Sequence, residues 1–161
     1  MNRREIIEML TRLRIPFTLV EHPPAETIEE IEGFHLPHAE TIVKNLFLRD
    51  DKKREYFLLV LRKDKTVNLK ELRALLGTRP LSFASESDLS RYLGVRKGSV
   101  TPFGVLNDTA RGVQVILDRD ILGYPSIGVH PDENTATLWL PPEELRRLIE
   151  DHGNPLRCLE V

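Results

Sequence analysis

The run from Glu55 to Leu61 constrains the fold more than any other stretch of the sequence. After Glu55 it is continuously apolar or aromatic, Tyr-Phe-Leu-Leu-Val-Leu, and charged residues stand on both sides of it, at 50–54 and 62–65. A strand with one face in water alternates between apolar and polar residues, whereas a strand covered on both faces appears as a continuous apolar run. The run therefore predicts a central strand of a sheet that is packed on both faces.

The remaining elements are predicted from hydrophobic periodicity and from the residues that start or stop them. Apolar residues at helical spacing, with proline, glycine and capping signals, predict helices over residues 3–13, 26–31, 68–77, 85–94 and 141–153. Alternating or apolar runs predict strands over 17–22, 41–48, 55–61, 112–122 and 156–161, and a hairpin within 126–140. This order predicts a single α+β domain over residues 1–161, with a mixed central sheet of about six or seven strands and surrounding helices.

The composition excludes several classes of protein. A chain of 161 residues can fold as one domain without covalent cross-links. Cys158 is the only cysteine, which excludes an internal disulfide framework and a cysteine-based zinc site. The 23 Lys and Arg residues are balanced by 25 Asp and Glu residues, so a polyanionic partner has to be held by local patches. No apolar run approaches the roughly 20 residues of a membrane span, and no signal segment is present, so we expect a cytoplasmic protein without membrane contact.

Motifs for cofactors and for the common hydrolase mechanisms are absent. The chain contains no GxGxxG, GxxxxGK[ST], HExxH or GxSxG motif. The spacing of His22, His35 and His38 matches no common metal-binding pattern. Cys158 lies within the last four residues on a predicted edge strand, which does not favour it as a nucleophile. We therefore expect neither a cofactor nor a metal ion.

Lys44 is the most unusual residue of the predicted second strand. Strand alternation places Ile42, Lys44, Leu46 and Leu48 on one face, so an ammonium group interrupts an apolar row, and it places Asn45 on the opposite face. A buried ammonium is costly unless it is paired or its side chain reaches water at the strand end. Two interpretations are open: a lysine that extends to solvent, and a lysine that binds a ligand.

The predicted hairpin brings a histidine and an asparagine to one turn. Pro131-Asp132 supplies the turn residues, His130 ends the first strand and Asn134 opens the second. The imidazole and the carboxamide would then share a rim, which we interpret as a candidate site. The alternative is a turn without chemistry, in which Pro131 fixes the backbone and Asn134 closes it.

A third feature is the loop from Gly98 to Gly104, which contains two glycines and a proline and is followed by Asn107-Asp108. Glycines of this kind permit close backbone approach to a ligand, although simple turn geometry is their commoner use. The lysine in an apolar strand, the His-Pro turn and this loop together suggest a pocket that positions a substrate and a water molecule.

The three segments together resemble the YbaK/ProX-type aminoacyl-tRNA editing domains. Lys44 to Leu48, Gly98 to Gly104 with Asn107-Asp108, and His130-Pro131 with Asn134-Thr135 occur in the order and at the separations found in that family. The resemblance covers residues from about 17 to 150 and favours the free-standing ProX branch, the prolyl-tRNA editing proteins. It implies an α+β fold with a mixed central sheet, in agreement with the elements predicted from periodicity.

The resemblance also implies an activity: trans-editing hydrolysis of mischarged alanyl-tRNA(Pro), with prolyl-tRNA excluded by the size of the pocket. Lys44 matches the functionally central lysine of the family and is the expected catalytic residue. The expected substrate-binding residues are Asn45, Ile42, Thr101, Pro102, Phe103, Gly104, Gly128, Val129, His130 and Asn134. Ile42, Val129 or His130 would form the wall that excludes proline. The implied partner is tRNA(Pro) carrying the wrong amino acid, and the resemblance leaves open whether prolyl-tRNA synthetase is a second partner and what the oligomeric state is.

An aminoacyl ester is already activated, so orientation and a few aimed dipoles suffice and a catalytic triad is not required. We expect Lys44 to anchor the terminal adenosine or its ester, backbone N–H groups of the glycine-containing loops to polarise the carbonyl, and water to attack with help from the 2′-hydroxyl. Basic groups at 52–54, 62–65 and 96–97 are the candidate tRNA contacts. Three alternatives stay open: a cysteinyl-tRNA(Pro) deacylase of the YbaK branch, a non-catalytic module that binds tRNA or a synthetase, and an interaction domain that pairs through a strand edge and has no RNA role.

Overall fold

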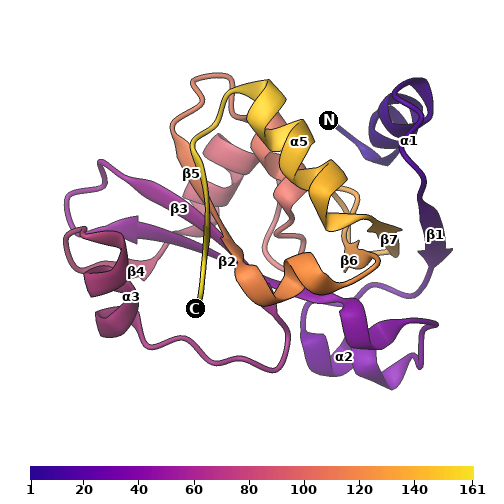
Figure 1. Cartoon of the computed structure of the whole chain (residues 1–161), viewed down its shortest axis with the longest axis horizontal. Coiled ribbons are helices and arrows are strands. Elements are labelled where there is room, and N and C mark those ends of the chain that lie inside the picture. Colours follow the sequence, from indigo (N-terminus) through magenta and orange to yellow (C-terminus); the bar gives the residue numbers. More distant parts are fainter.

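Eight strands form two sheets in the computed structural model, which describes residues 1–161 (Figure 1). The strands are β1 (Thr18–Glu21), β2 (Val43–Asp50), β3 (Tyr56–Arg62), β4 (Leu81–Phe83), β5 (Val113–Asp118), β6 (Ile127–Val129), β7 (Ala136–Leu140) and β8 (Leu156–Leu159). The α-helices are α1 (Arg3–Arg12), α2 (Ile28–Gly33), α3 (Leu69–Leu76), α4 (Glu86–Asp88) and α5 (Pro142–His152). Shorter helical segments are η1 (Ala39–Thr41), the π-helical η2 (Leu89–Leu93), η3 (Pro102–Asn107) and η4 (Arg119–Gly123).

The larger sheet has the order β4-β2-β3-β5-β8 and is mixed, because β4, β2 and β3 pair antiparallel whereas β5 and β8 run parallel to β3. The smaller sheet, β1-β7-β6, is antiparallel. The predicted α+β class and mixed central sheet are confirmed. The central sheet, however, has five strands and not six or seven, since β1 and the β6–β7 hairpin form a sheet of their own.

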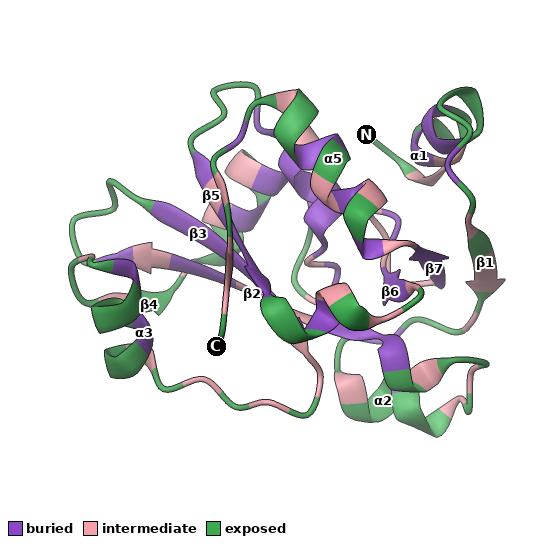
Figure 2. Cartoon of the chain, in the orientation of Figure 1, coloured by how far each residue is buried: buried purple, intermediate pink, exposed green.

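The predicted central strand is β3, and its two faces belong to two different cores. Tyr56, Leu58 and Val60 lie in the largest hydrophobic cluster, whereas Phe57, Leu59 and Leu61 lie in a second cluster beneath α3. All six side chains are buried, and Figure 2 shows β3 and β5 coloured mostly as buried, as are β6 and β7 of the other sheet. A continuous apolar run is thus explained by two hydrophobic layers that share one strand.

The predicted helix boundaries are confirmed where capping chemistry is strong. Asn68 caps α3, its side chain accepting from the backbone N–H groups of Lys70 and Glu71, and Gly77 ends that helix in the left-handed region at φ 66°. The predicted helix over 85–94 is different: a capping box at Ser85 starts one turn of α-helix, which continues as the π-helical η2. None of the helices combines the length and the apolar character needed to cross a membrane.

The two sheets meet at a single backbone bridge. Ile42, just before β2, pairs in parallel with Gly128 in the middle of β6. A Cβ atom on Gly128 would lie 2.9 Å from Ile42 Cγ1 and 3.0 Å from the indole ring of Trp139, so only glycine fits this contact without a shift. The bridge brings the beginning of β2 next to the hairpin that carries His130.

Candidate functional site

A cleft of about 340 Å³ opens where the beginning of β2 faces the end of β6. Six of the residues predicted for the site line it: Ile42, Lys44, Asn45, Gly128, Val129 and His130. The strand β4 pairs with β2 only from Leu48 to Asp50, so the first residues of β2 have an open edge on that side. The cleft therefore forms where two sheets meet and where one strand lacks a neighbour.

Lys44 lines this cleft, and its ammonium is bonded to the turn that follows β3. Its Nζ donates to the backbone oxygen of Lys65 at 2.7 Å, and the side chain is half-buried. No carboxylate lies within salt-bridge distance of this ammonium, whereas Lys63, the other lysine of the cleft, pairs with Glu32 at 3.6 Å and donates to the Ala39 oxygen. An ammonium group has three donors. Lys44 thus keeps two donors and an unneutralised charge for a ligand.

Asn45 lies on the opposite face of β2, as strand alternation predicts, and it also lines the cleft. Its Oδ1 atom is buried and has no hydrogen-bond partner. Leaving a buried acceptor unpaired costs about 1 to 3 kcal/mol, so a ligand that donates to this oxygen would recover that free energy.

His130 forms part of the cleft wall in its neutral form. Burial lowers the pKa of this imidazole, and the nearby His22 acts in the same direction, while the hydrogen bond to Ala136 opposes them. Since the Ala136 carbonyl can only accept, His130 Nδ1 carries the proton of this 3.1 Å bond, and Nε2 is left as an acceptor. The ring is therefore uncharged at neutral pH.

The loop from Gly98 to Gly104 contributes to the cleft only through its first part. Gly98 and Val100 line it, and Gly98, at φ 83°, packs directly on Glu26, where an added Cβ would lie 3.1 Å from the Glu26 Cα. The other predicted positions, Thr101, Pro102, Phe103 and Gly104, are buried at the start of η3 and are not in the cleft wall. The Thr101 hydroxyl donates to the backbone oxygen of His130, so this segment supports the site from behind.

Asn134 also lies outside the cleft wall. The hairpin is confirmed, but β7 begins at Ala136, two residues later than predicted. The backbone oxygen of Asn134 accepts from Ala25, which holds the segment before α2 against the hairpin. The predicted shared rim of imidazole and carboxamide is therefore replaced by a rim made of His130 and the residues that follow Ala25.

Several residues of the cleft were not predicted. They come from the segment around α2, from the turn after β3 and from β7: Glu26, Thr27, Glu29, Lys63 and Thr137. The carboxylates of Glu26 and Glu29 are exposed and have no basic partner. Their only signal in the sequence was an acidic stretch before a short helix, which is typical of any helix N-terminus.

Comparisons with known proteins show which proteins this chain resembles. The family model described as "Aminoacyl-tRNA editing domain" matches residues 22–148. The chain is 43% identical over 159 residues to "Prolyl-tRNA editing protein ProX" of Acetoanaerobium sticklandii, covering 99% of this chain and 97% of that one. It is 42% identical over 152 residues to "Prolyl-tRNA synthetase associated domain-containing protein 1" of Danio rerio, covering 92% and 82%. A solved structure, provisionally assigned as a trans-editing enzyme for prolyl tRNA synthetase, superposes with a TM-score of 0.73 at 25% identity over 99% of this chain and 96% of the other.

Proposed function

Because the chain belongs to the aminoacyl-tRNA editing domain family, we propose that it is a trans-editing hydrolase that removes a wrongly attached amino acid from tRNA(Pro). The amino acid that we assign is alanine, and we assign the activity to residues 1–161 acting as one editing domain. The observation that carries the proposal is the cleft whose lining residues include both Lys44, an ammonium without a carboxylate partner, and His130, a neutral imidazole.

The reaction needs a water molecule, an activated carbonyl and a place for negative charge. Water attacks the ester carbonyl carbon, the tetrahedral intermediate collapses, and the bond to the ribose oxygen breaks as that oxygen takes up a proton, giving the free amino acid and tRNA(Pro). Lys44 offers two N–H donors to the oxygen that becomes negative or to the terminal adenosine. Such a group, fixed before the reaction, stabilises the developing charge more than mobile water does.

Charges at the mouth of the cleft suit the rest of the substrate. An aminoacyl ester carries a protonated α-amino group beside the carbonyl. Glu26 and Glu29 present carboxylates without basic partners on the wall of the same cleft. A cationic group can therefore be bound at the mouth while the carbonyl oxygen faces Lys44.

We attribute selectivity for alanine to the small space that the cleft wall leaves for the amino-acid side chain. A synthetase site made for proline rejects a smaller side chain by only about 1 to 3 kcal/mol per missing methylene, so a second and smaller site is needed to remove the error. Ile42 and Val129 are buried at the cleft and His130 is partly buried there, and we propose that these three limit the space for the amino-acid side chain.

The direct test is single-turnover deacylation of alanyl-, cysteinyl- and prolyl-tRNA(Pro). We expect rapid loss of alanine, slow loss of cysteine and no loss of proline above the uncatalysed rate. Lys44→Met keeps the length of the side chain but removes its donors, and we expect it to lower the rate on alanyl-tRNA(Pro) by about 100-fold or more, as removal of one oxyanion donor does elsewhere. Faster release of cysteine would favour the YbaK-type activity, and a Lys44→Met rate within a factor of about two of the unaltered protein would exclude this role of Lys44.

A further inference from the structure

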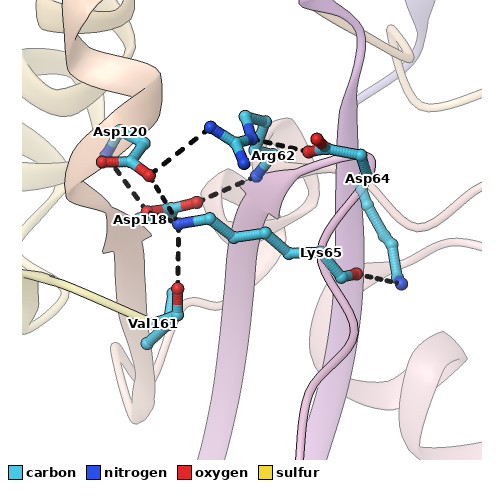
Figure 3. A network of polar contacts seen from close by, with 7 residues as sticks. Arg62, Asp64, Lys65, Asp118, Asp120 and Val161 are labelled. Carbon is cyan, nitrogen blue, oxygen red and sulfur yellow. Dashed lines mark hydrogen bonds and ion pairs between the residues drawn. The ribbon is translucent and has the colours of Figure 1, made fainter.

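The turn that holds Lys44 is fixed by a network of charged residues outside the cleft. Lys65 bonds in two directions: its backbone oxygen accepts from Lys44 Nζ at 2.7 Å, and its own Nζ donates to Asp118 at 2.9 Å and pairs with Asp120 at 2.8 Å. Figure 3 shows the Lys65 side chain extended toward these two carboxylates. We call Lys65, Asp118 and Asp120 the Lys65 clamp.

Asp118 is the fixed point of this clamp. Its side chain is fully buried at the end of β5, and it accepts from three donors: Lys65 Nζ, the Asp120 backbone N–H at 3.0 Å and the Arg62 backbone N–H at 3.0 Å. A buried carboxylate is tolerated when it is paired and hydrogen-bonded in this way. Arg62 ends β3 and begins the turn, and Lys65 ends the turn. Asp118 therefore binds the turn at both ends, through the backbone N–H of Arg62 and through the side-chain amine of Lys65.

The position of the Lys65 oxygen decides where the Lys44 ammonium lies. A lysine side chain has four flexible carbon–carbon torsions, and fixing it costs conformational entropy. The bond to the Lys65 oxygen selects one position, and the tetrahedral geometry of the ammonium then directs its two remaining donors. If the turn moved, the two remaining N–H donors of Lys44 would no longer point to one defined position of the substrate.

From these contacts we propose that Lys65 and Asp118 are positioning residues of the deacylation reaction, acting through Lys44. The inference rests on the proposed function, since it assigns to the clamp a part in the chemistry of the same cleft. It also assigns Lys65 a role other than tRNA contact, because its amine is occupied by two carboxylates and by the backbone oxygen of Val161.

The experiment compares Lys65→Met, Lys65→Arg and a control, Arg146→Met, in deacylation of alanyl-tRNA(Pro). Arg146 forms exposed ion pairs with Glu150 and Glu143 on α5, so the control removes one positive charge and its ion pairs away from the cleft. We expect Lys65→Met to lower kcat about tenfold with KM changed by less than about twofold. Lys65→Arg restores the charge-assisted bonds and should recover most of kcat, and Arg146→Met should match the unaltered protein. A kcat for Lys65→Met within twofold of the unaltered protein would overturn the inference.

A second measurement does not depend on turnover. Competitive acylation of lysine amines, read by mass spectrometry, gives the labelling of Lys44 relative to the exposed Lys97. We expect this ratio to rise several-fold in Lys65→Met, since the Lys44 amine is released from the Lys65 oxygen, and an unchanged ratio would show that the clamp does not position Lys44. If Lys65→Met does not fold, Asp120→Asn removes the charge of the half-exposed carboxylate that pairs with Lys65 and leaves Asp118 in place. We expect this variant to change kcat and labelling in the same directions. An Asp120→Asn protein without either change would count against the clamp.

Failure of this inference and failure of the proposed function give different results. Activity that survives Lys44→Met rejects the role of Lys44 itself. Activity that is lost in Lys44→Met but is unchanged in Lys65→Met, with unchanged labelling, rejects only the clamp.

Discussion

Three side chains of the cleft have hydrogen-bonding capacity that the protein does not use. Asn45 Oδ1 is buried without a partner, Lys44 keeps two donors, and His130 Nε2 is an acceptor that no protein group occupies. In contrast, both carboxylate oxygens of the buried Asp118, outside the cleft, accept hydrogen bonds. A ligand bound in the cleft could therefore form hydrogen bonds with these three groups.

His130→Ala tests the wall of the cleft. Removal of the ring enlarges the space next to Val129, so we expect the ratio of alanyl- to prolyl-tRNA(Pro) deacylation to fall about tenfold, through faster release of proline. The two substrates are measured with the same protein preparation, so that a partly unfolded variant does not affect the ratio. An unaltered ratio would place the discriminating wall elsewhere.

At the scale of elements, the site depends on how the two sheets are joined. The backbone pairing between the two sheets is the bridge from Ile42, just before β2, to Gly128 in β6, which the absence of a side chain on Gly128 permits. The loop that ends in η3 and the segment before α2 close the cleft from two other sides through Gly98 and Glu26. Each wall comes from a different element, so small shifts between elements alter the cleft.

Gly128→Ala should therefore damage both stability and activity. The added methyl group would lie about 3 Å from Ile42 and from the Trp139 ring, and overpacking of this kind costs about 1 to 3 kcal/mol. We expect a lower midpoint of denaturant unfolding and a reduced kcat/KM. Gly112→Ala is the matched control, since nothing lies within 4 Å of a Cβ at that position. Equal stability of the two variants would show that the sheets adjust to the methyl group.

The basic pair next to the cleft is the expected contact for the tRNA backbone. Arg96 and Lys97 are exposed, directly precede Gly98 and form no salt bridge, whereas Arg62, Lys63 and Lys65 are all paired with acids. Arg96→Ala with Lys97→Ala should raise KM for alanyl-tRNA(Pro) and reduce the slope of log affinity against log salt by about 1 to 2. Lys52→Ala with Arg54→Ala, at the far end of the β2–β3 hairpin, is the control. A larger effect of the control pair would indicate that the tRNA binds at that end of the molecule instead.

For the whole molecule, one partly buried carboxyl group, that of Asp132, lies between the N-terminus and the functional hairpin. Asn107 accepts from the N-terminal amine of Met1 and donates to Asp132 Oδ2 at 3.3 Å. Asp132 follows Pro131 in the hairpin loop at φ 60°, and its Oδ1 is buried without a partner. Burial raises the pKa of Asp132 to about 6.

This shift predicts how stability depends on pH. The folded state holds the Asp132 proton between about pH 4 and 6 while the unfolded state releases it, so this group makes the protein less stable as the pH rises through that window. Asp132→Asn should therefore stabilise the protein by about 1 to 3 kcal/mol at pH 7.5 and have no effect below about pH 4. Asparagine also tolerates the left-handed backbone. Denaturant unfolding at several pH values measures this difference.

Asp51→Asn is the control of opposite sign. The hydrogen bond from Arg79 lowers the pKa of Asp51, so this variant should lose stability at neutral pH and approach the unaltered protein in acid. An Asp132→Asn gain that is the same at pH 4 and 7.5 would show that titration of this carboxyl group is not its cause.

The sequence by itself determined the elements whose signals are local. The apolar run of β3 predicted burial on both faces, Asn68 and Gly77 predicted the ends of α3, and alternation placed Lys44 and Asn45 on opposite faces of β2. The motifs that carry the family resemblance were likewise visible in the sequence, and the family is confirmed.

Only the tertiary structure decided how these elements share space. Periodicity shows that a segment is a strand but not which strand it pairs with, so the separation of β1, β6 and β7 into a second sheet was not predicted. For the same reason Thr101 to Gly104 lie behind the cleft and Glu26 lines it. The contact between Lys44 and the Lys65 oxygen joins residues 21 positions apart, and no local pattern encodes it. The sequence specifies which side chain stands at each position, but long-range packing determines which groups surround that side chain.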